Sequence, residues 1–194
     1  MSRRLSSSLV ALASLAVAAP QASAQQPAAA TPVSMLGQVA PDFTAPVQMK
    51  GAVSPKPFKL SDYKGQTVVL AFYPKARTQG CTIQMEAYRD KYASLFKDGQ
   101  KVVLVGVSAD ADTTIAAWAT EKGFQFRLVS DMDGAVAKSY ATWNEQNKVA
   151  SRHLIMVGPD GKIVFEQRPF RVTAQEAYTL LGEAVEKSTK AGGN

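Results

Sequence analysis

Cysteine and histidine are almost absent: the 194 residues include one of each, Cys81 and His153. With a single cysteine, the chain cannot form an intramolecular disulfide. Metal sites in proteins usually have three or four protein ligands, which one histidine and one cysteine far apart in the sequence do not supply. We therefore expect no metal or other cofactor, and we expect His153 to be an ordinary strand residue.

Clustered charge is also missing. The chain has 22 Lys and Arg against 16 Asp and Glu, a formal net charge of +6, but the charges of both signs are interspersed. Proteins that bind nucleic acids usually gather their basic residues into a patch or stripe. Nucleic acid is therefore not an expected partner, and we attribute the excess positive charge to solubility.

An apolar run near the start is too short to span a membrane. It extends from Leu9 to Ala19, whereas a transmembrane helix needs about 20 apolar residues. Arg3 and Arg4 precede it and a small-residue cleavage site, Ala-Ser-Ala at 22–24, follows it, which is the pattern of a secretory signal peptide. No cysteine follows the cleavage site to carry a lipid anchor. We expect export to the periplasm or the cell exterior, without membrane attachment.

The rest of the chain is expected to form one domain. Residues 25–34 are low in complexity and are expected to be a flexible linker, residues 35–188 a single folded domain, and residues 189–194 a flexible tail. Apolar periodicity predicts an alternation of strands and helices. Strands are expected at 43–47, 58–60, 68–73, 101–107, 126–130, 152–157 and 162–166, and helices at 79–97, 112–122 and 134–140, with a last helix opening at the capping box Thr173-x-x-Glu176. This order is typical of an α/β sandwich.

Cys81 occupies a chemically distinctive place in this pattern. A buried strand ends at Pro74, a short polar loop follows, and the next helix begins close to the cysteine. A helix N-terminus carries partial positive charge and unpaired N–H donors, so it favours a thiolate over a thiol. Arg77 adds a nearby cation, and the hydroxyl of Thr78 can donate to sulfur. The alternative is a cysteine that acts as a small buried hydrophobe, but its neighbours are polar or flexible rather than core-like.

The spacing Pro74-x-x-x-Thr78-x-x-Cys81 resembles the active-site motif of the peroxiredoxins, in the AhpC/TSA superfamily. The longer string, Phe72-Tyr73-Pro74-Lys75-Ala76 followed by Thr78, Gly80-Cys81-Thr82 and Gln84, resembles the PrxQ (bacterioferritin comigratory protein) branch. The likeness extends over about residues 37–170. It implies a thioredoxin-like fold with an N-terminal β-hairpin extension and a central sheet flanked by helices, in a thiol-dependent peroxidase that acts as a monomer or a homodimer.

The resemblance also implies roles for particular residues. Cys81 would attack hydrogen peroxide or an organic hydroperoxide and become a sulfenic acid. Thr78 would hydrogen-bond sulfur and peroxide, and Pro74 would shield the sulfur from water. A family arginine stands nine residues before the glycine of an Asp-Gly-Lys turn, and Arg152 stands nine before Gly161. It would hold the thiolate ionised; otherwise Arg152 would be an exposed arginine on a strand edge.

Several positions depart from the PrxQ pattern. Glu86 stands where PrxQ-like proteins often carry a resolving cysteine, five residues after the first, so this chain would be a 1-Cys variant. Gln79 replaces a common proline, and Ile155 and Gly158 replace a common phenylalanine and aspartate. The sulfenic acid would need an external thiol, such as a thioredoxin-like protein, a glutaredoxin or a glutathione-like molecule, or a Cys81–Cys81 link between subunits.

Three other functions fit the same residues less well. A thiol–disulfide exchange protein on this fold usually has a Cys-x-x-Cys motif, and here Gln84 occupies the second cysteine position. A non-catalytic thiol redox sensor would differ from the enzyme only in lacking turnover. A copper chaperone would need further metal ligands.

Overall fold

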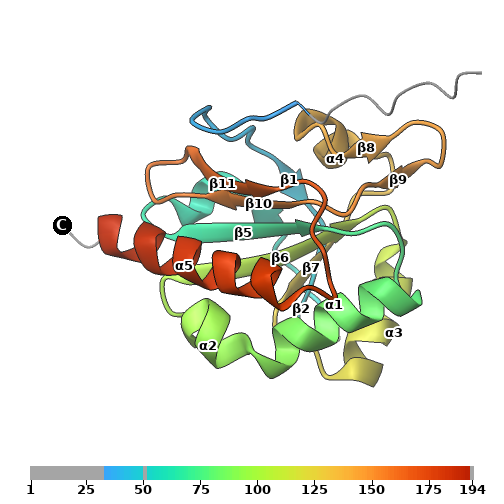
Figure 1. Cartoon of the computed structure of the whole chain (residues 1–194). Coiled ribbons are helices and arrows are strands. Elements are labelled where there is room, and N and C mark those ends of the chain that lie inside the picture. The colour runs from blue at the N-terminus through green and yellow to red at the C-terminus, as the bar shows by residue number, and fades with distance from the viewer. Residues whose placement is uncertain (1–32, 50–51, 193–194) are drawn as a thin grey trace, which may run out of the picture. The chain divides into compact units, whose positions relative to one another are not determined.

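The computed structural model describes residues 33–49 and 52–192, so the predicted signal peptide and residues 25–32 of the predicted linker lie outside it. A seven-stranded sheet forms its centre, in the order β11-β10-β5-β6-β7-β2-β3 (Figure 1). Its strands are β2 (Val47–Met49), β3 (Ala52–Val53), β5 (Thr67–Phe72), β6 (Val102–Ser108), β7 (Arg127–Ser130), β10 (Leu154–Val157) and β11 (Ile163–Gln167).

The directions of the strands bring the start of β10 close to the C-terminal ends of the parallel strands. Strands β5, β6 and β7 are parallel, whereas β10 runs antiparallel to β5 with Leu154 opposite Ala71. The C-terminal ends of the parallel strands and the start of β10 therefore lie side by side, and the loops that leave them share one rim of the sheet. Loops at the C-terminal ends of the strands of an α/β sheet are a common location of binding sites.

Both faces of the sheet are covered, which explains why β5 and β6 are mostly apolar. Every residue of these two strands is buried, as expected for parallel strands between two layers. One face packs against α1 (Gln79–Asp90), α2 (Tyr92–Phe96), α3 (Asp112–Lys122) and α5 (Gln175–Ala191), and the other against α4 (Ala135–Ser139) and the N-terminal region (Figure 1). Two 3₁₀ helices, η1 (Leu60–Tyr63) and η2 (Lys97–Gly99), complete the helical elements described.

Short strand pairs extend this architecture. β2 and β3 form an antiparallel pair that joins the main sheet beyond β7, whereas the two strands predicted for the N-terminal hairpin, 43–47 and 58–60, coincide with β1 (Thr44–Ala45) and β4 (Phe58–Lys59). β1 pairs with β4 in a separate two-stranded sheet. A further hairpin, β8 (Trp143–Asn144) with β9 (Val149–Ala150), follows α4 and was not predicted, and neither was β3.

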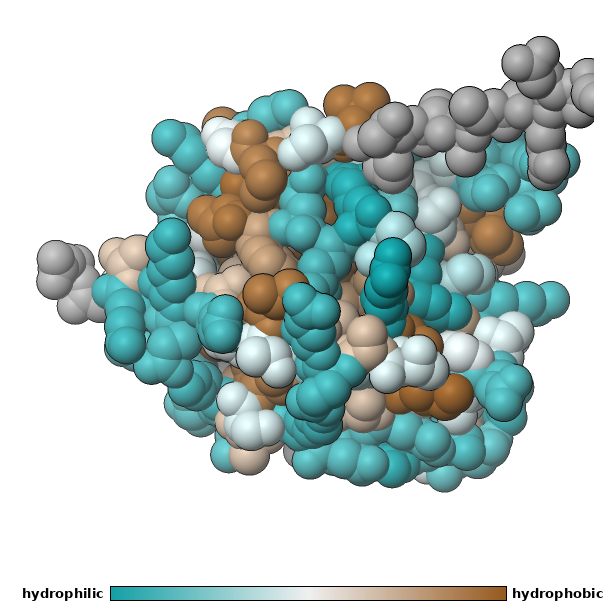
Figure 2. All heavy atoms as spheres, viewed as in Figure 1, coloured by the Kyte–Doolittle hydropathy of each residue, from teal (hydrophilic) through white to brown (hydrophobic). Residues whose placement is uncertain are grey.

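The segment 34–40, which we call the N-terminal strap, runs along the outer edge of β11. The amide of Gly37 donates to the carbonyl of Ile163 (2.8 Å), and the amide of Ile163 donates to the carbonyl of Gln38 (2.9 Å). The exposed side chains of Leu36 and Val164 lie here, beside a groove of about 860 Å³ between the strap, β11 and α5. Figure 2 shows apolar side chains gathered on this part of the surface.

The predicted fold class is confirmed, but two helix predictions were wrong in detail. The single helix expected over 79–97 is broken at Lys91, whose φ of −103° and ψ of 19° end α1 and let α2 start in a new direction. The periodicity hid the break because apolar residues on both sides pack into the same core, such as Tyr88 and Phe96 with rings 5.5 Å apart.

The capping box predicted at Thr173 is also wrong. The N-cap residue of α5 is Ala174, and Glu176 is only the second residue of the helix. A different local contact marks this helix start, because the hydroxyl of Tyr178, in the first turn of α5, donates to the carbonyl of Val172 (2.8 Å) in the turn before the helix. At its other end the helix continues to Ala191, so the boundary that we expected after residue 188 falls inside α5.

Candidate active site

Cys81 is the third residue of α1 and its side chain is completely buried. Thr78, the N-cap residue, has extended backbone angles, and the first helical hydrogen bond runs from the amide of Thr82 to the carbonyl of Thr78 (2.9 Å). The amides of the first turn have no partner within a helix of this kind. The sulfur therefore lies where backbone dipoles favour negative charge.

Arg152, which is 71 residues further along the chain, contacts this sulfur. Its Nη2 atom lies 3.3 Å from Sγ of Cys81, within hydrogen-bond distance for sulfur. A guanidinium keeps its charge at all ordinary pH values and can only donate. The pair therefore places a permanent cation and donor against a buried thiol.

The sheet explains why these distant residues meet. Arg152 and His153 lie just before β10, not within a strand that begins at residue 152 as we predicted. The amide of Phe72 donates to the carbonyl of His153 (2.9 Å), so this segment is attached to the end of β5. Because β5 leads directly into the loop before α1, Arg152 and Cys81 both lie beyond the C-terminal end of β5.

Gln84 holds the other arm of the arginine. Nη1 of Arg152 donates to Oε1 of Gln84 (2.6 Å), and Nε2 of Gln84 donates to the hydroxyl of Tyr88 (3.1 Å). Gln84 and Tyr88 are fully buried, and burial raises the pKa of Tyr88 far above its usual value, so the phenol stays neutral. The guanidinium is thus fixed between a sulfur and an amide, both on α1.

Gly80 makes this approach sterically possible. A β-carbon at this position would lie 3.1 Å from Nη2 of Arg152, closer than most real contacts of that atom type. A larger residue at position 80 would displace the guanidinium from the sulfur. The lack of a side chain at Gly80 therefore leaves the space that the Arg152 guanidinium occupies.

Thr78 and Pro74 lie in the loop between β5 and α1. The Thr78 hydroxyl donates to the carbonyl of Lys75 (2.8 Å) rather than to sulfur, and its side chain makes no capping bond to the described part of α1. Its oxygen keeps two lone pairs with which it can accept a hydrogen bond. Pro74 is half-buried in the same turn. Their predicted catalytic roles stay predictions.

Asp110 anchors this loop from the end of β6. Its Oδ2 atom accepts hydrogen bonds from the amide of Ala76 (2.7 Å) and the hydroxyl of Ser108 (2.9 Å). Arg77 adopts a left-handed φ of 64° next to this anchor and forms an ion pair with Glu121 of α3. Arg77, which we expected to act on the thiolate, is therefore engaged with α3.

His153 lies on the α4 side of the sheet, among Arg168 and Glu166. Burial, together with the Arg168 cation, lowers the pKa of His153 to about 4, although Glu166 partly opposes this. The imidazole is therefore neutral at ordinary pH. Its surroundings are those of a buried polar cluster rather than of an ordinary strand residue, which corrects the sequence-based interpretation.

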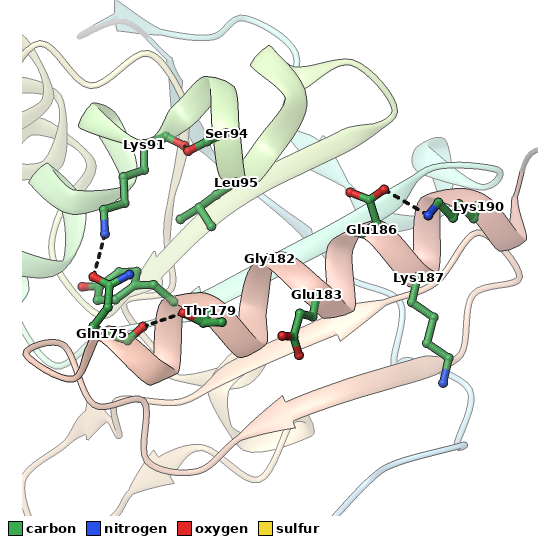
Figure 3. A pocket seen from close by; sticks show the side chains of 11 residues that line it. Lys91, Ser94, Leu95, Gln175, Thr179, Gly182, Glu183, Glu186, Lys187 and Lys190 are labelled. Atoms are coloured by element: carbon green, nitrogen blue, oxygen red, sulfur yellow. Dashed lines mark hydrogen bonds and ion pairs between the residues drawn. The ribbon is translucent and has the colours of Figure 1, made fainter.

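Another groove of the described surface lies away from this site. This groove, of about 830 Å³, lies between α2 and α5, and Figure 3 shows lysine and glutamate side chains of α5 along it, with Lys91 at the break between α1 and α2. Lys91 bonds to Gln175 there, and Lys190 pairs with Glu186. None of the residues predicted to act on peroxide lines it.

Comparison with known proteins agrees with this geometry. The family model described as "AhpC/TSA family" matches residues 36–166. Peroxiredoxin Bcp of Escherichia coli is 34% identical over 133 residues, which cover 66% of this chain and 81% of that protein. This chain belongs to the AhpC/TSA family. It is a peroxiredoxin of the Bcp/PrxQ type, and hence a thiol-dependent peroxidase.

Solved structures show the same fold. The bacterioferritin comigratory protein of Xanthomonas campestris superposes with a TM-score of 0.65 at 24% identity, covering 75% of this chain and 92% of that one. AhpC of Enterococcus faecalis gives a TM-score of 0.71 at 21% identity, covering 82% of this chain and 95% of the other. The predicted thioredoxin-like peroxiredoxin fold is thereby confirmed.

Glu86 forms an ion pair with Lys122 of α3 in this peroxiredoxin. Its Oε1 atom lies 3.1 Å from Nζ of Lys122, at the C-terminal end of α3, and both side chains are about one-third exposed. Arg89 adds a second tie between the same helices, donating to the carbonyl of Lys122 (2.7 Å). The position where PrxQ-like proteins often have a second cysteine thus attaches α1 to α3.

Sequence reasoning placed Cys81 and Arg152 in one peroxiredoxin site but missed the residues that orient them. Gln84 lies one helical turn after Cys81, so the i,i+3 spacing put both on one face of α1. That spacing could have suggested Gln84 as a partner of the site. Asp110 carried no local signal, because its contact with Ala76 depends on the pairing of β5 with β6.

Proposed function

We propose that Cys81 is the nucleophile that reduces peroxides in this peroxiredoxin and that Arg152 is its electrostatic partner. The observation that carries the proposal is the 3.3 Å contact between Nη2 of Arg152 and Sγ of a completely buried cysteine at a helix N-terminus. A cation held without reorganisation in a water-poor site interacts more strongly with charge than it would in water.

The first step is a displacement at oxygen. The Cys81 thiolate attacks one oxygen of the peroxide, an S–O bond forms, and the O–O bond breaks. Sulfur is oxidised by two electrons to the sulfenic acid, and the other oxygen takes a proton and leaves as water or an alcohol. Arg152 stabilises the thiolate before the attack and the leaving oxygen during it.

Thr78 and Pro74 position the substrate in this proposal. Because the Thr78 hydroxyl donates to Lys75, its oxygen can accept a hydrogen bond from the O–H group of the peroxide. The amides of Gly80 and Cys81 supply further donors at the start of α1. Pro74 has no N–H group to compete for the substrate and limits the access of water. Hydrogen peroxide and organic hydroperoxides both present the O–O–H group that this arrangement fits.

Recycling requires a thiol from outside the chain, because Cys81 is the only cysteine. One external thiolate attacks the sulfenic sulfur, releases water and forms a mixed disulfide. A second thiol then attacks this disulfide, which restores Cys81 and gives the oxidised reductant. A thioredoxin-like protein, a glutaredoxin or a glutathione-like thiol would serve, and a Cys81–Cys81 link in a homodimer is the alternative route.

We further propose that the protein works after export, in the periplasm or outside the cell. The proposal rests on the arginines, apolar run and cleavage site of residues 1–24. Among residues 33–49 and 52–192, no helix has the length and apolar character to cross a bilayer.

Stopped-flow oxidation of the reduced protein by hydrogen peroxide tests the proposal. Trp118 packs on Tyr73, with ring centroids 5.8 Å apart, and so provides a fluorescence probe next to the loop at Pro74. We expect rapid, stoichiometric formation of a sulfenic acid at Cys81, identified by mass spectrometry, and no such reaction in Cys81→Ser. A rate like that of free cysteine would contradict the proposal and favour a redox sensor or a thiol-exchange protein.

A further inference from the structure

Three polar side chains that the peroxidase step does not use are buried together beside α4. Glu166 and Arg168 form an ion pair with Oε1 and Nη2 2.9 Å apart, and each side chain is only 6% exposed. His153 is 7% exposed and lies against them. Although burial opposes it, hydrogen bonds from Arg168, Met35 and Ser34 hold the pKa of Glu166 below its usual value.

Arg168 connects three elements through its two terminal nitrogens. Besides Glu166, Nη2 donates to the carbonyl of Tyr140 at the end of α4 (3.1 Å). Nη1 donates to the carbonyl of Ala141 (3.2 Å) and lies 3.3 Å from Nδ1 of His153. Four acceptors on different parts of the chain therefore converge on one planar group, an arrangement that suits guanidinium and not ammonium.

The contact with Arg168 fixes the state of the histidine. Arginine can only donate, so Nδ1 of His153 must accept, and the ring proton resides on Nε2. A doubly protonated ring could not make this bond and would bring a second cation within 3.3 Å of Nη1. The His153 ring is thus held in one orientation and one tautomer.

The cluster is also attached to the N-terminal strap. The amide of Met35 donates to Oε1 of Glu166 (3.0 Å), and the hydroxyl of Ser34 donates to Oε2 (2.9 Å). Glu166 is therefore held on both sides, by the strap and by Arg168. The strap, β11, α4 and the start of β10 meet at this carboxylate and guanidinium.

This network lies directly behind the arginine of the site. His153 follows Arg152 in the chain, and the amide of Phe170, two residues after Arg168, donates to the carbonyl of Arg152 (2.8 Å). Arg152 precedes β10, so its backbone lacks the regular pairing of a strand interior. Its placement depends on these contacts together with the bond from Phe72 to His153.

We propose that Arg168 is a positioning residue for peroxide reduction: through its bonds to His153 and Glu166 it holds the segment 152–153 so that the Arg152 guanidinium meets Sγ of Cys81. The inference rests on the proposed function, because it assumes that Arg152 acts on Cys81. Buried ion pairs contribute little net stability compared with apolar residues of similar size, so the principal effect of this pair is geometric. A displacement of about 1 Å can lower a rate about 100-fold.

The test compares rate constants for oxidation of Cys81 by hydrogen peroxide in variants of this cluster. Removing Arg168 alone would leave Glu166 buried and unpaired, so the principal variant is the double substitution Glu166→Gln/Arg168→Met. Arg168→Lys keeps the charge but loses the forked donors. Arg127→Met is the matched control, because Arg127, at the start of β7, packs over the ring of Tyr63 and is separated from β10 by the two strands β5 and β6.

We expect the double variant to fold and to react about tenfold more slowly, Arg168→Lys to recover only part of the rate, and the control to react like the unsubstituted protein. The deciding measurement repeats the double substitution in an Arg152→Met background. If Arg168 acts through Arg152, the substitution has no further effect there.

The outcomes separate the two proposals. Slow oxidation of the unsubstituted protein would overturn the proposed function itself. Fast oxidation of that protein and an equal rate in the folded double variant would overturn only the role of Arg168. A loss that persists in the Arg152→Met background would also overturn it, as would full recovery in Arg168→Lys. If the double variant does not fold, His153→Leu, which removes only the histidine contact, is put through the same cycle.

Discussion

The guanidinium of Arg152 and the amide of Gln84 are joined by a 2.6 Å hydrogen bond, while the second terminal nitrogen of the same arginine contacts the sulfur of Cys81. Gln84 is on α1, and Arg152 lies in the segment just before β10. This bond therefore joins the helix that carries the thiol to the segment that carries the cation. Its geometry leads to predictions that distinguish orientation from simple charge.

Gln84→Leu should lower the rate constant for oxidation of Cys81 by about tenfold. The substitution keeps the side-chain volume roughly constant but removes the acceptor that orients Arg152. Stopped-flow fluorescence with hydrogen peroxide measures the effect. Gln125→Leu is a matched control, because Gln125 bonds to the carbonyl of Arg89 (3.2 Å) at the other end of α1. Equal rates in the two variants would contradict an orienting role for Gln84.

Gly80→Ala should separate stability from activity. Alanine favours a helix over glycine by about 0.8–1 kcal/mol, but its β-carbon would lie 3.1 Å from Nη2 of Arg152. We expect unchanged or higher thermal stability together with slower oxidation of Cys81. Gly182→Ala in α5 is the control, because its β-carbon would make only an ordinary 3.5 Å contact with Leu95. A Gly80→Ala enzyme as fast as the unsubstituted protein would show that the guanidinium tolerates the displacement.

Asp110→Ala should loosen the loop that carries Thr78. It removes the acceptor of the Ala76 amide and leaves that amide without its 2.7 Å bond. We expect oxidation of Cys81 to slow by about tenfold and Asp110→Asn, which retains an oxygen acceptor, to slow less. Measurement over several peroxide concentrations gives the second-order rate constant. A smaller loss in Asp110→Ala than in Asp110→Asn would argue against this hydrogen bond as the cause.

The stability of the fold should fall as the pH decreases from about 6.5 toward 4. His153 is neutral in the folded protein because burial and Arg168 lower its pKa to about 4, whereas in the unfolded chain it titrates near 6.5. In that interval the unfolded state binds more protons, so its free energy falls relative to that of the folded state. The contribution is complete above the unfolded pKa and decreases below it.

Urea unfolding at pH 7 and pH 5 measures this dependence. We expect a decrease in the free energy of unfolding on the order of 2 kcal/mol from His153 alone. His153→Leu should remove this part of the pH dependence, whatever its effect on stability at pH 7. An identical slope in both proteins would show that the histidine is not the group responsible.

The sequence predicted those parts of the fold that depend on local patterns. The apolar run of β5 and the strand β6 lie within one residue of their expected positions, and Gly123 ends α3 with a φ of 65°, as its place in the sequence indicated. The position of Cys81 at the start of a helix also followed from its neighbours. Each of these features is determined by residues close together in the chain.

The remainder depends on contacts between distant segments. No local pattern shows that the amide of Met35 binds Glu166, that Arg168 binds His153, or that Ala76 binds Asp110. The start of α5 was misplaced for a different reason, because the competing bond, from Tyr178 to Val172, is itself local and outweighs the capping preference of Thr173. The family resemblance supplied Arg152, but neither its contact with Gln84 nor the cluster behind it.

The N-terminal strap has a consequence for self-association. An uncovered edge strand offers its free amides and carbonyls to any other extended chain, and both backbone groups of Ile163 are instead bonded to residues 37 and 38. A second copy could add to the sheet through this part of β11 only by first displacing the strap. That displacement would also release Met35 and Ser34 from Glu166, so edge-to-edge polymerisation would come at the expense of the network behind Arg152.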